Sequence, residues 1–278
     1  MSLLGDKVAE AINRAIESDR LVLPTMPETA MRVREVADDP DANIKDLGNV
    51  IGHDAALTAR IIKVANSPLY RASSTIEDLN MALMRLGMTL TCSLATGLAM
   101  EQMFQATSDI VDRRLRDVWK RSTEVAGICA VLCKHRTKLR PDQATLAGLV
   151  YQIGVLPILS YAEEHPVLLK DGISLDSVIQ QIHPTIGSKI LAAWDFPREI
   201  QNVPSEYLNF SRQVAQADYA DLVTVAMLQS QFSANENFAE VDYTQVTAFE
   251  RLGLDPEMQA AEAEDLSAEM EAAITALQ

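Results

Sequence analysis

Residues 23–70 of the chain read LPTMPETAMRVREVADDPDANIKDLGNVIGHDAALTARIIKVANSPLY. Apolar side chains recur in this stretch at steps of three and four residues, as at Leu57, Ile61 and Val64, which is the period of a helix with one buried face. Prolines and the break DDPDAN stand between the periodic runs, where helices are expected to begin and end. The stretch therefore predicts a series of short packed helices.

The same period continues through the rest of the chain, and the strict alternation of a half-buried strand is almost absent. The expected fold class is all-α. Capping residues and prolines place the helices at about residues 28–36, 44–51, 55–66, 74–87, 89–104, 109–140, 144–164 (a pair hinged near Gly154 and Pro157), 175–182, 184–194, 196–204 and 212–232.

The final stretch, residues 255–278, has seven acidic residues, seven alanines and no lysine or arginine. Leu266, Met270, Ile274 and Leu277 would form a narrow apolar stripe along a helix. Such a stripe loses its tertiary support in water, so we expect it to dock on the chain's own core or on a second copy in a homodimer.

Composition excludes several classes of protein. The 278 residues carry 24 Lys and Arg against 39 Asp and Glu, a net charge of -15, which disfavours nucleic acid as a partner. No apolar run approaches the roughly 20 residues that span a bilayer, so we expect no membrane partner. Three cysteines and no recognisable secretory leader predict a cytoplasmic protein, with Cys129 and Cys133 as buried thiols one helical turn apart.

Four histidines are the candidate metal ligands: His53, His135, His165 and His183. His53-Asp54 has the dipeptide that gives the HD metal hydrolases their name, but Asp54 also stands where the next helix needs an N-cap acceptor, and we interpret it as a cap. Lysines and arginines surround His135, and His165 lies at a helix end. His183 begins the expected helix at 184–194, as a capping or core residue or as part of a site.

Residues 23–70 resemble the start of the HDOD family: Pro24 and Pro27 bracket the first helix, Asp39-Pro40 breaks it, and Asp54 leads a helix that ends in ANS beside an aromatic residue. SSTIEDLNMALMRLGM extends the likeness, and a weaker one reaches about residue 213. The resemblance implies an N-terminal helical subdomain (21–106) packed on an HD-like helical core (107–213), preceded by a helix (1–20) and followed by a helical extension (214–278).

Catalytic HD proteins carry histidines and aspartates in this core. The resemblance places other residues at most of those positions: Arg121, Tyr151, Gln152, Tyr207 and Met227, with His183 retained. A two-metal hydrolase needs several imidazoles and carboxylates that converge. We therefore expect no metal ligands and no catalytic residues, and these six positions would form a vestigial pocket.

The resemblance implies a bacterial output or scaffold module that acts through contacts with signalling proteins, has no cofactor and is not an enzyme. Two alternatives remain open. In the first, the protein is a sensor whose vestigial pocket binds a small anionic ligand, such as a nucleotide or a cyclic dinucleotide. In the second, it is a residual phosphohydrolase whose pocket holds metal. If the protein is instead a module that acts through protein contacts, we expect side chains such as Tyr151 and Met227 to fill the pocket.

Overall fold

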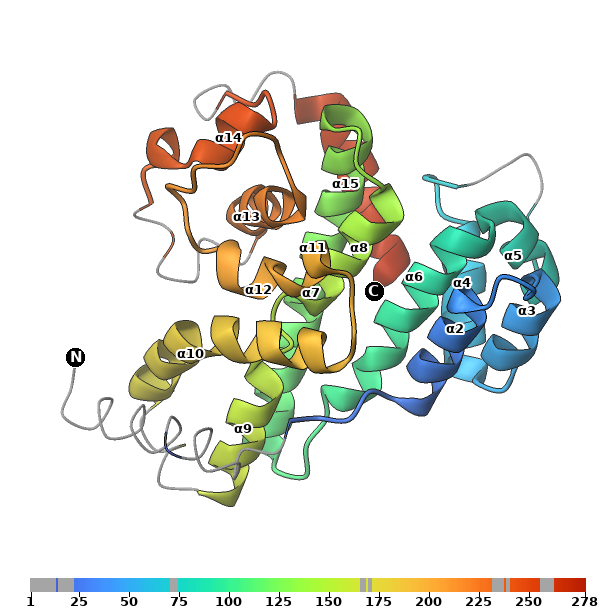
Figure 1. Cartoon of the computed structure of the whole chain (residues 1–278), viewed down its shortest axis with the longest axis horizontal. Helices are drawn as coiled ribbons and strands as arrows, with labels where there is room; N and C mark the ends of the chain where they lie inside the picture. Colours follow the sequence, from blue (N-terminus) through green and yellow to red (C-terminus); the bar gives the residue numbers. More distant parts are fainter. Residues whose placement is uncertain are drawn as a thin grey trace.

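The long helix α7 (Asp109–Arg136) runs through the middle of the molecule (Figure 1). Its second half, from Ser122 to Cys133, is buried all round because neighbouring helices cover it on several sides. Helix α8 (Pro141–Val150) packs against it most closely at Gly148, where a Cβ atom would lie 2.4 Å from the Cα of Ala126. Glycine at this position therefore allows the two backbones to touch.

The computed structural model describes residues 14, 23–70, 75–165, 169, 172–231, 238, 241–255 and 263–278. The expected helix at 1–20 lies outside these residues except for residue 14. The described residues contain helices and no strands, which confirms the all-α class.

The N-terminal subdomain is a group of short helices that pack on one another and, through α6, on the core (Figure 1). Side-chain caps open three of them: Asn43, Asp54 and Asp78 each accept a hydrogen bond from a backbone N–H of the first turn. The cap interpretation of Asp54 is confirmed, since its Oδ1 accepts from the Leu57 N–H at 2.9 Å. The elements are α2 (Glu28–Asp38), α3 (Ile44–Gly52), α4 (Ala55–Ala65), α5 (Leu79–Leu86), α6 (Met88–Ala99) and the 3-10 turn η1 (Met100–Met103).

The HD-like core surrounds α7 and α8. Helix α13 (Tyr219–Gln229), in the C-terminal extension, is buried from Tyr219 to Leu228, so it is part of the same core. The remaining elements are α9 (Val155–Glu164), α10 (Gly172–Ala193), α11 (Arg198–Gln201), α12 (Val203–Glu206), α13 (Tyr219–Gln229), η4 (Tyr243–Gln245) and α14 (Thr247–Arg251).

Three expected helix boundaries are wrong. Helix α5 begins after the cap Asp78 rather than at the capping-box pattern 74–77, of which Ser74 lies outside the described residues. Helix α10 continues through Pro184, so His183 lies inside a helix and does not begin one. Helix α13 begins after Asp218 and not at Arg212, because Asp218 and Asp221 form a reciprocal capping box there.

The C-terminal helix α15 (Ala263–Leu277) docks on the chain's own core, along α7. A Cβ at Gly127 would lie 2.8 Å from the backbone nitrogen of Ile274, so the two helices are nearly in backbone contact. The Arg60 guanidinium donates to the Leu277 carbonyl oxygen and thereby connects the end of α15 to α4. Met270, Ile274 and Leu277 pack on the core, and docking of the stripe is confirmed for these residues.

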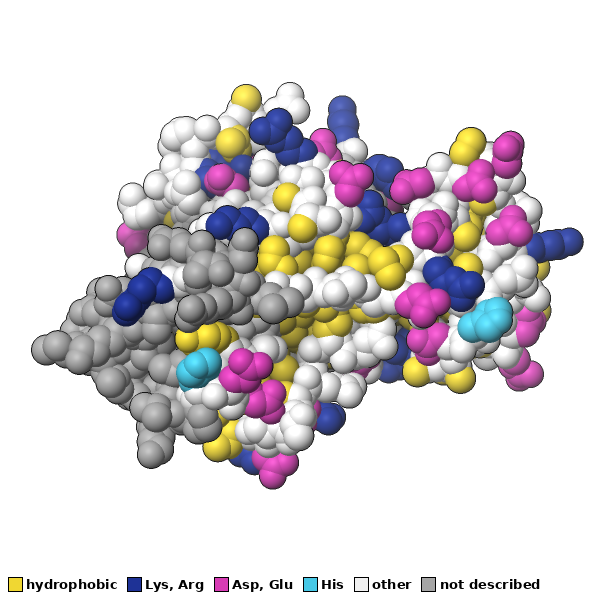
Figure 2. Space-filling model, turned by 60° about the horizontal axis from the view of Figure 1, so that its bottom comes forward, with side chains coloured by type: hydrophobic (Ala, Val, Ile, Leu, Met, Phe, Trp, Pro, Cys, Tyr) yellow, Lys and Arg dark blue, Asp and Glu magenta, His cyan; other side chains and the backbone are white. Residues whose placement is uncertain are grey.

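One stretch of the described chain, Pro141–Glu164, is long and apolar enough to span a membrane by length and composition, although no such run was expected. In the folded protein, 89% of the most apolar 18-residue segment of this stretch is buried. It forms α8 and α9, which are core helices. On the face in Figure 2, acidic side chains are interspersed with lysines and arginines over the described part of the chain.

Candidate functional site

Four helices bring five of the six expected site residues to one place beside α7. Arg121 comes from α7, Tyr151 and Gln152 from the turn that follows α8, His183 from the middle of α10, and Tyr207 from the end of α12. Tyr151, His183 and Tyr207 are each at most 2% exposed. The positions that the resemblance aligned with metal ligands thus do converge.

Two glycines allow this convergence. A Cβ at Gly154 would lie 2.1 Å from the His183 carbonyl oxygen and 2.6 Å from the backbone nitrogen of Gly187. On the other side of α10, a Cβ at Gly187 would lie 2.8 Å from Cβ of Pro204, at the start of α12. Because no side chain separates these backbones, α10 lies directly against the turn after α8 and against α12.

The centre of the cluster is a hydrogen bond between the Tyr207 hydroxyl and His183 Nε2, 3.0 Å long and buried. The ring of Tyr151 stands edge-on to that of Tyr207, with centroids 5.0 Å apart and an interplanar angle of 89°. This is a favourable aromatic geometry. Two polar atoms, His183 Nδ1 and Gln152 Oε1, are buried without a hydrogen-bond partner among the residues that the structure describes.

Burial and the nearby Arg121 charge determine how these groups ionise. Burial, with a smaller effect from Arg121, lowers the pKa of His183 to about 3, so the imidazole is neutral at physiological pH. Burial raises the pKa of Tyr151 and, well above its usual value, the pKa of Tyr207, although the Arg121 charge opposes both shifts. At neutral pH the cluster therefore contains a neutral imidazole and two neutral phenols next to one guanidinium.

Met227, the sixth expected site residue, takes no part in the hydrogen bond and the ring contact that define this cluster. It is a buried core residue of α13, 4% exposed. The part of α13 that reaches Tyr207 is one turn earlier, where the Thr224 hydroxyl donates to the Tyr207 carbonyl oxygen at 2.7 Å.

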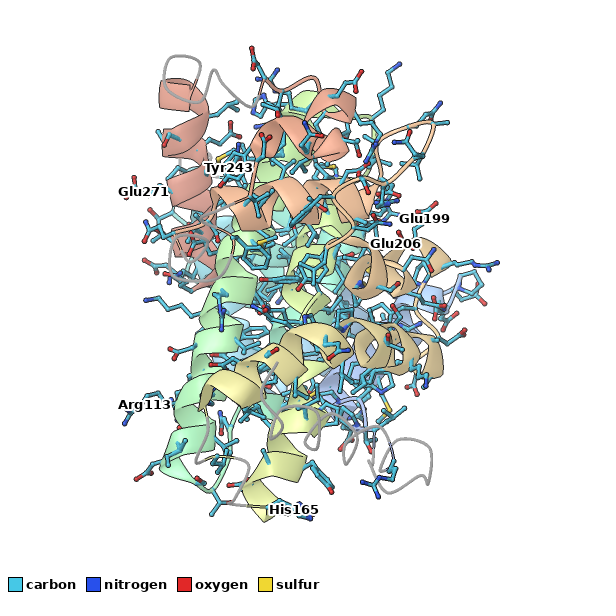
Figure 3. All side chains as sticks on the ribbon, turned by 90° about the vertical axis from the view of Figure 1, so that its left-hand side faces the viewer. Arg113, His165, Glu199, Glu206, Tyr243 and Glu271 are labelled. Atoms are coloured by element: carbon cyan, nitrogen blue, oxygen red, sulfur yellow. The ribbon has the colours of Figure 1, made fainter. Side chains whose placement is uncertain are left out.

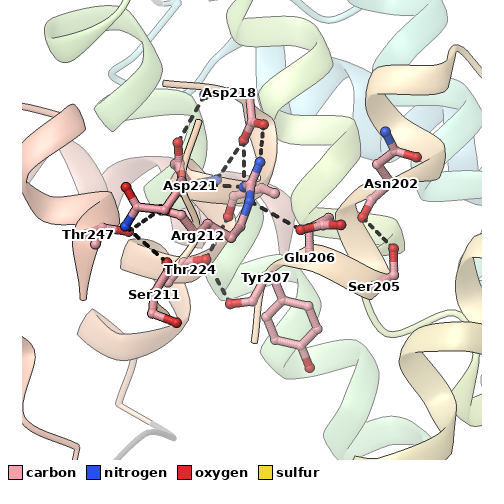
Figure 4. Close-up of polar contacts among 12 residues, drawn as sticks. Asn202, Ser205, Glu206, Tyr207, Ser211, Arg212, Asp218, Asp221, Thr224 and Thr247 are labelled. Carbon is pink, nitrogen blue, oxygen red and sulfur yellow. Dashed lines mark hydrogen bonds and ion pairs between the residues drawn. The ribbon is translucent and has the colours of Figure 1, made fainter. Parts of the chain in front are cut away.

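Behind Tyr207 lies an ion network that the sequence interpretation missed (Figure 4). Asp221, 1% exposed, accepts from the Arg251 guanidinium at 2.7 and 2.9 Å and from Arg212 at 3.3 Å. Arg212 also pairs with Asp218 and Glu206. The capping-box spacing of Asp218 and Asp221 was the available signal. The network connects α12, α13 and α14 and so supports the helix end that carries Tyr207.

The residues of the cluster do not fit a divalent metal. His183 Nε2, one of its two possible ligand atoms, is already bonded to Tyr207, and the neighbouring guanidinium repels a cation. Phenols with raised pKa values and an amide are poor substitutes for the imidazoles and carboxylates of two-metal hydrolases. Among the described residues, no group of three or more His, Cys, Asp or Glu is arranged to hold a metal ion.

Comparison with known proteins agrees with the fold. The family model described as the HDOD domain matches residues 23–207. The chain belongs to the HDOD family. An uncharacterised protein of Treponema pallidum (strain Nichols) is 21% identical to this HDOD protein over 194 residues, which are 65% of the chain. The chain aligns with only 36% of that relative's length.

Solved structures extend the likeness over nearly the whole HDOD protein. A protein of Shewanella amazonensis SB2B, provisionally named a metal-dependent phosphohydrolase, has a TM-score of 0.87 and 32% identity, with 99% of each chain covered. An HDOD domain protein of unknown function from Geobacter sulfurreducens has a TM-score of 0.64 and 20% identity, covering 98% of this chain and 97% of that one.

A third structure, from Marinobacter aquaeolei VT8 and provisionally named a signal transduction protein, has a TM-score of 0.66 and 21% identity. The alignment covers 98% of this chain and 65% of the Marinobacter chain. The HDOD protein is therefore related to proteins whose names point to two different functions, hydrolysis and signalling, and the chemistry of its own cluster has to distinguish between them.

Proposed function

We propose that this HDOD protein is a non-catalytic signal-transduction module that acts through contacts with other proteins, and that side chains fill its HD-like site. The single observation that carries the proposal is the buried hydrogen bond between Tyr207 and His183 Nε2, enclosed by the ring of Tyr151. The retained histidine is thereby used in packing and hydrogen bonding. A hydrolase would need it as a metal ligand.

The electrostatics of the cluster support the same proposal. Hydrolysis of a phosphodiester in HD enzymes depends on metal-activated water, which requires neutral imidazoles and carboxylates around a cation. Here Arg121 provides the fixed charge, and burial together with this charge lowers the pKa of His183, the one imidazole of the cluster. The site therefore resembles a packed core more than a reaction centre.

The test compares wild type with His183→Gln. Metal content is measured by elemental analysis, and hydrolysis of a chromogenic phosphodiester and of cyclic dinucleotides is measured with added Mn²⁺ or Mg²⁺. We expect no stoichiometric metal and equal background rates for both proteins. Stoichiometric metal together with a turnover that His183→Gln abolishes would disprove the proposal, whereas turnover that survives the substitution would identify a contaminating hydrolase.

A second function, that of a small-ligand sensor, has one observation in its favour. Gln152 Oε1 and His183 Nδ1 are buried polar atoms without partners among the described residues, and they lie beside a guanidinium of the kind that binds anions. A thermal-shift screen of nucleotides and cyclic dinucleotides distinguishes the two functions. A sensor should melt at a higher temperature with saturating ligand, and Arg121→Ala should remove that shift.

The matched control for Arg121→Ala is Arg113→Ala, on the same helix. Arg113 is exposed and points away from the fold (Figure 3), so its loss should leave any ligand response unchanged. A flat response in wild type and in both variants is the result that we expect for a protein-contact module.

A further inference from the structure

The molecule has a groove between the end of α4 and α15, and none of the residues of the HD-like cluster lines it. Its volume is about 560 Å³ and it is open to solvent along one side. One wall comes from Lys63 and the turn after α4, and the other comes from α15. An open groove does not enclose a small molecule in the way that typical ligand pockets do, so its shape suits a helix or another protein surface.

The α15 side of the groove is formed mainly by short side chains. Apart from Glu271, the α15 side chains that line the groove are small: Ala268, Ala272, Thr275 and Ala276. Helices approach one another according to the size of the side chains between them. On the opposite side of α15, the absence of a side chain at Gly127 of α7 allows a similarly close approach to Ile274. Ala268 and Ala272 would allow a second helix to approach α15 closely on the groove side.

The floor of the groove holds a buried polar atom with no bond. Ser67 lines the groove and is 6% exposed, and its hydroxyl has no hydrogen-bond partner among the residues that the structure describes. The neighbouring Asn66 is not available to it, because the Asn66 amide is bonded on both sides to the backbone of Ile76. Buried hydroxyls in folded proteins are nearly always bonded, so an occupant of the groove is expected to supply the partner.

The two walls carry opposite charges. Lys63 stands on the α4 wall and Glu271 on the α15 wall, and both are exposed. In the described part of the chain neither forms an ion pair. Glu271 points outward from α15 (Figure 3). In a two-fold arrangement of two copies, the Lys63 of each copy would face the Glu271 of the other, because a surface in such an interface meets itself.

We propose that the groove is the contact surface of a symmetric homodimer, in which α15 of a second copy lies antiparallel to α15 and covers Ser67. A copy of this chain fits all three observations: it brings a helix with a small-residue face, it reverses the order of the two charges, and its Thr275 brings a hydroxyl. The net charge of -15 on each copy opposes association, but the Debye length is about 8 Å at physiological salt, so local charges dominate.

Charge reversal tests the pairing. Wild type should have twice the mass of the chain by light scattering at micromolar concentration in physiological salt. Lys63→Glu and Glu271→Lys should each weaken the dimer by about tenfold or more, since each places like charges together. The double variant should restore it. Lys45→Glu, an equal charge change at an exposed position of α3, should leave the dimer unchanged.

A cross-link tests the geometry independently. Cys92, Cys129 and Cys133 are all buried, and burial raises the pKa of each thiol. A new thiol in Ala272→Cys, near the expected two-fold axis, should therefore be the one that oxidises, giving a disulfide-linked dimer. Ala56→Cys, at an exposed alanine of α4, is the control and should stay monomeric under the same oxidation.

The proposal is overturned if wild type remains a monomer throughout this concentration range. It is also overturned if the wild-type dimer survives both single charge reversals, because the copies would then meet through another face. Circular dichroism of each variant separates loss of the dimer from loss of the fold. None of these outcomes depends on whether the HD-like cluster is catalytic.

Discussion

At the scale of single residues, His183 shows how much of the site can be predicted from the sequence. The structure brings His183 close to the turn that holds Tyr151 and Gln152, two residues that the resemblance had grouped with it. The bond between His183 and Tyr207 was not foreseeable. It depends on the close backbone contacts at Gly154 and Gly187, which no periodicity encodes.

Tyr207→Phe tests the value of that bond. The substitution keeps the ring against Tyr151 but leaves His183 Nε2 buried and unbonded, so we expect the free energy of unfolding to fall by about 1–3 kcal/mol. Urea denaturation measures the change. Tyr161→Phe, at a half-buried tyrosine of α9 that stacks on His165, should change stability less. Equal effects at the two tyrosines would mean that the buried bond contributes nothing special.

His183 also predicts how stability depends on pH. Its pKa is lowered to about 3 in the folded protein, from an ordinary value of 6.5, so between these values the unfolded chain binds the extra proton. The free energy of unfolding should therefore fall as pH decreases from 6.5 toward 3, by up to about 1.4 kcal/mol per pH unit from this group.

Comparing the pH slopes of wild type and His183→Gln isolates this contribution from that of the carboxylates. The variant should lose stability less steeply between pH 6.5 and pH 5, a range above the titration of most acidic side chains. Parallel slopes would show that His183 is not shielded from protons in the folded state.

At the scale of elements, the capping signal at Asp54 was right, the capping-box pattern at 74–77 was wrong, and local signals failed where tertiary contacts decide. Asp54 was identified as a cap because a helix needs an acceptor there. Arg212 was expected at the start of α13, yet it lies in the loop before that helix, where it forms ion pairs with Asp218 and Asp221. Helix α10 passes through Pro184, where a break was expected, since tertiary packing outweighs local propensity.

Gly127→Ala tests the contact of α15 with α7. The added Cβ would lie 2.8–2.9 Å from backbone and side-chain atoms of Ile274, so α15 has to shift, and we expect a loss of about 1–3 kcal/mol. Gly52→Ala is the matched control, because its Cβ would meet only Leu79 at an ordinary 3.8 Å. Thermal denaturation of both variants measures the difference. A Gly127→Ala protein as stable as the control would mean that α15 is loosely held.

At the scale of the whole molecule, α15 joins parts of the fold that are far apart in sequence. It packs along α7, and its last turn is bonded to Arg60 of α4. Glu269 adds bonds to Lys134 and His135 at the far end of α7. The apolar stripe predicted that this helix would dock, but the place where it docks could not be deduced from the stripe.

Deleting residues 257–278 should lower the free energy of unfolding by roughly 2–5 kcal/mol, because Leu277 and the partly buried Ile274 and Met270 leave the core. Chemical denaturation of the shortened chain measures this. Glu269→Gln keeps the helix and removes the carboxylate that pairs with Lys134 and His135 at the partly exposed surface, so it should cost about 1 kcal/mol or less. Unchanged stability after the deletion would contradict the role of α15 in holding the two parts together.

The net charge of -15 leads to a prediction for the molecule as a whole. Affinity for nucleic acid comes mainly from phosphate contacts that release counterions, and an acidic protein has few to offer. Fluorescence anisotropy with labelled duplex and single strands at physiological salt should show negligible binding. Micromolar affinity with a steep dependence on salt would reveal a basic surface that the average charge conceals.

The packing around His183 has a consequence for how such a protein changes over time. Replacing Tyr151 by a metal ligand would open a cavity beside Tyr207, and replacing Tyr207 would leave the imidazole buried and unbonded. Each single step toward a metal site therefore lowers stability before any cation can compensate. The packing of the two tyrosines against His183 therefore makes a stepwise change to a metal-binding site costly in stability at each step.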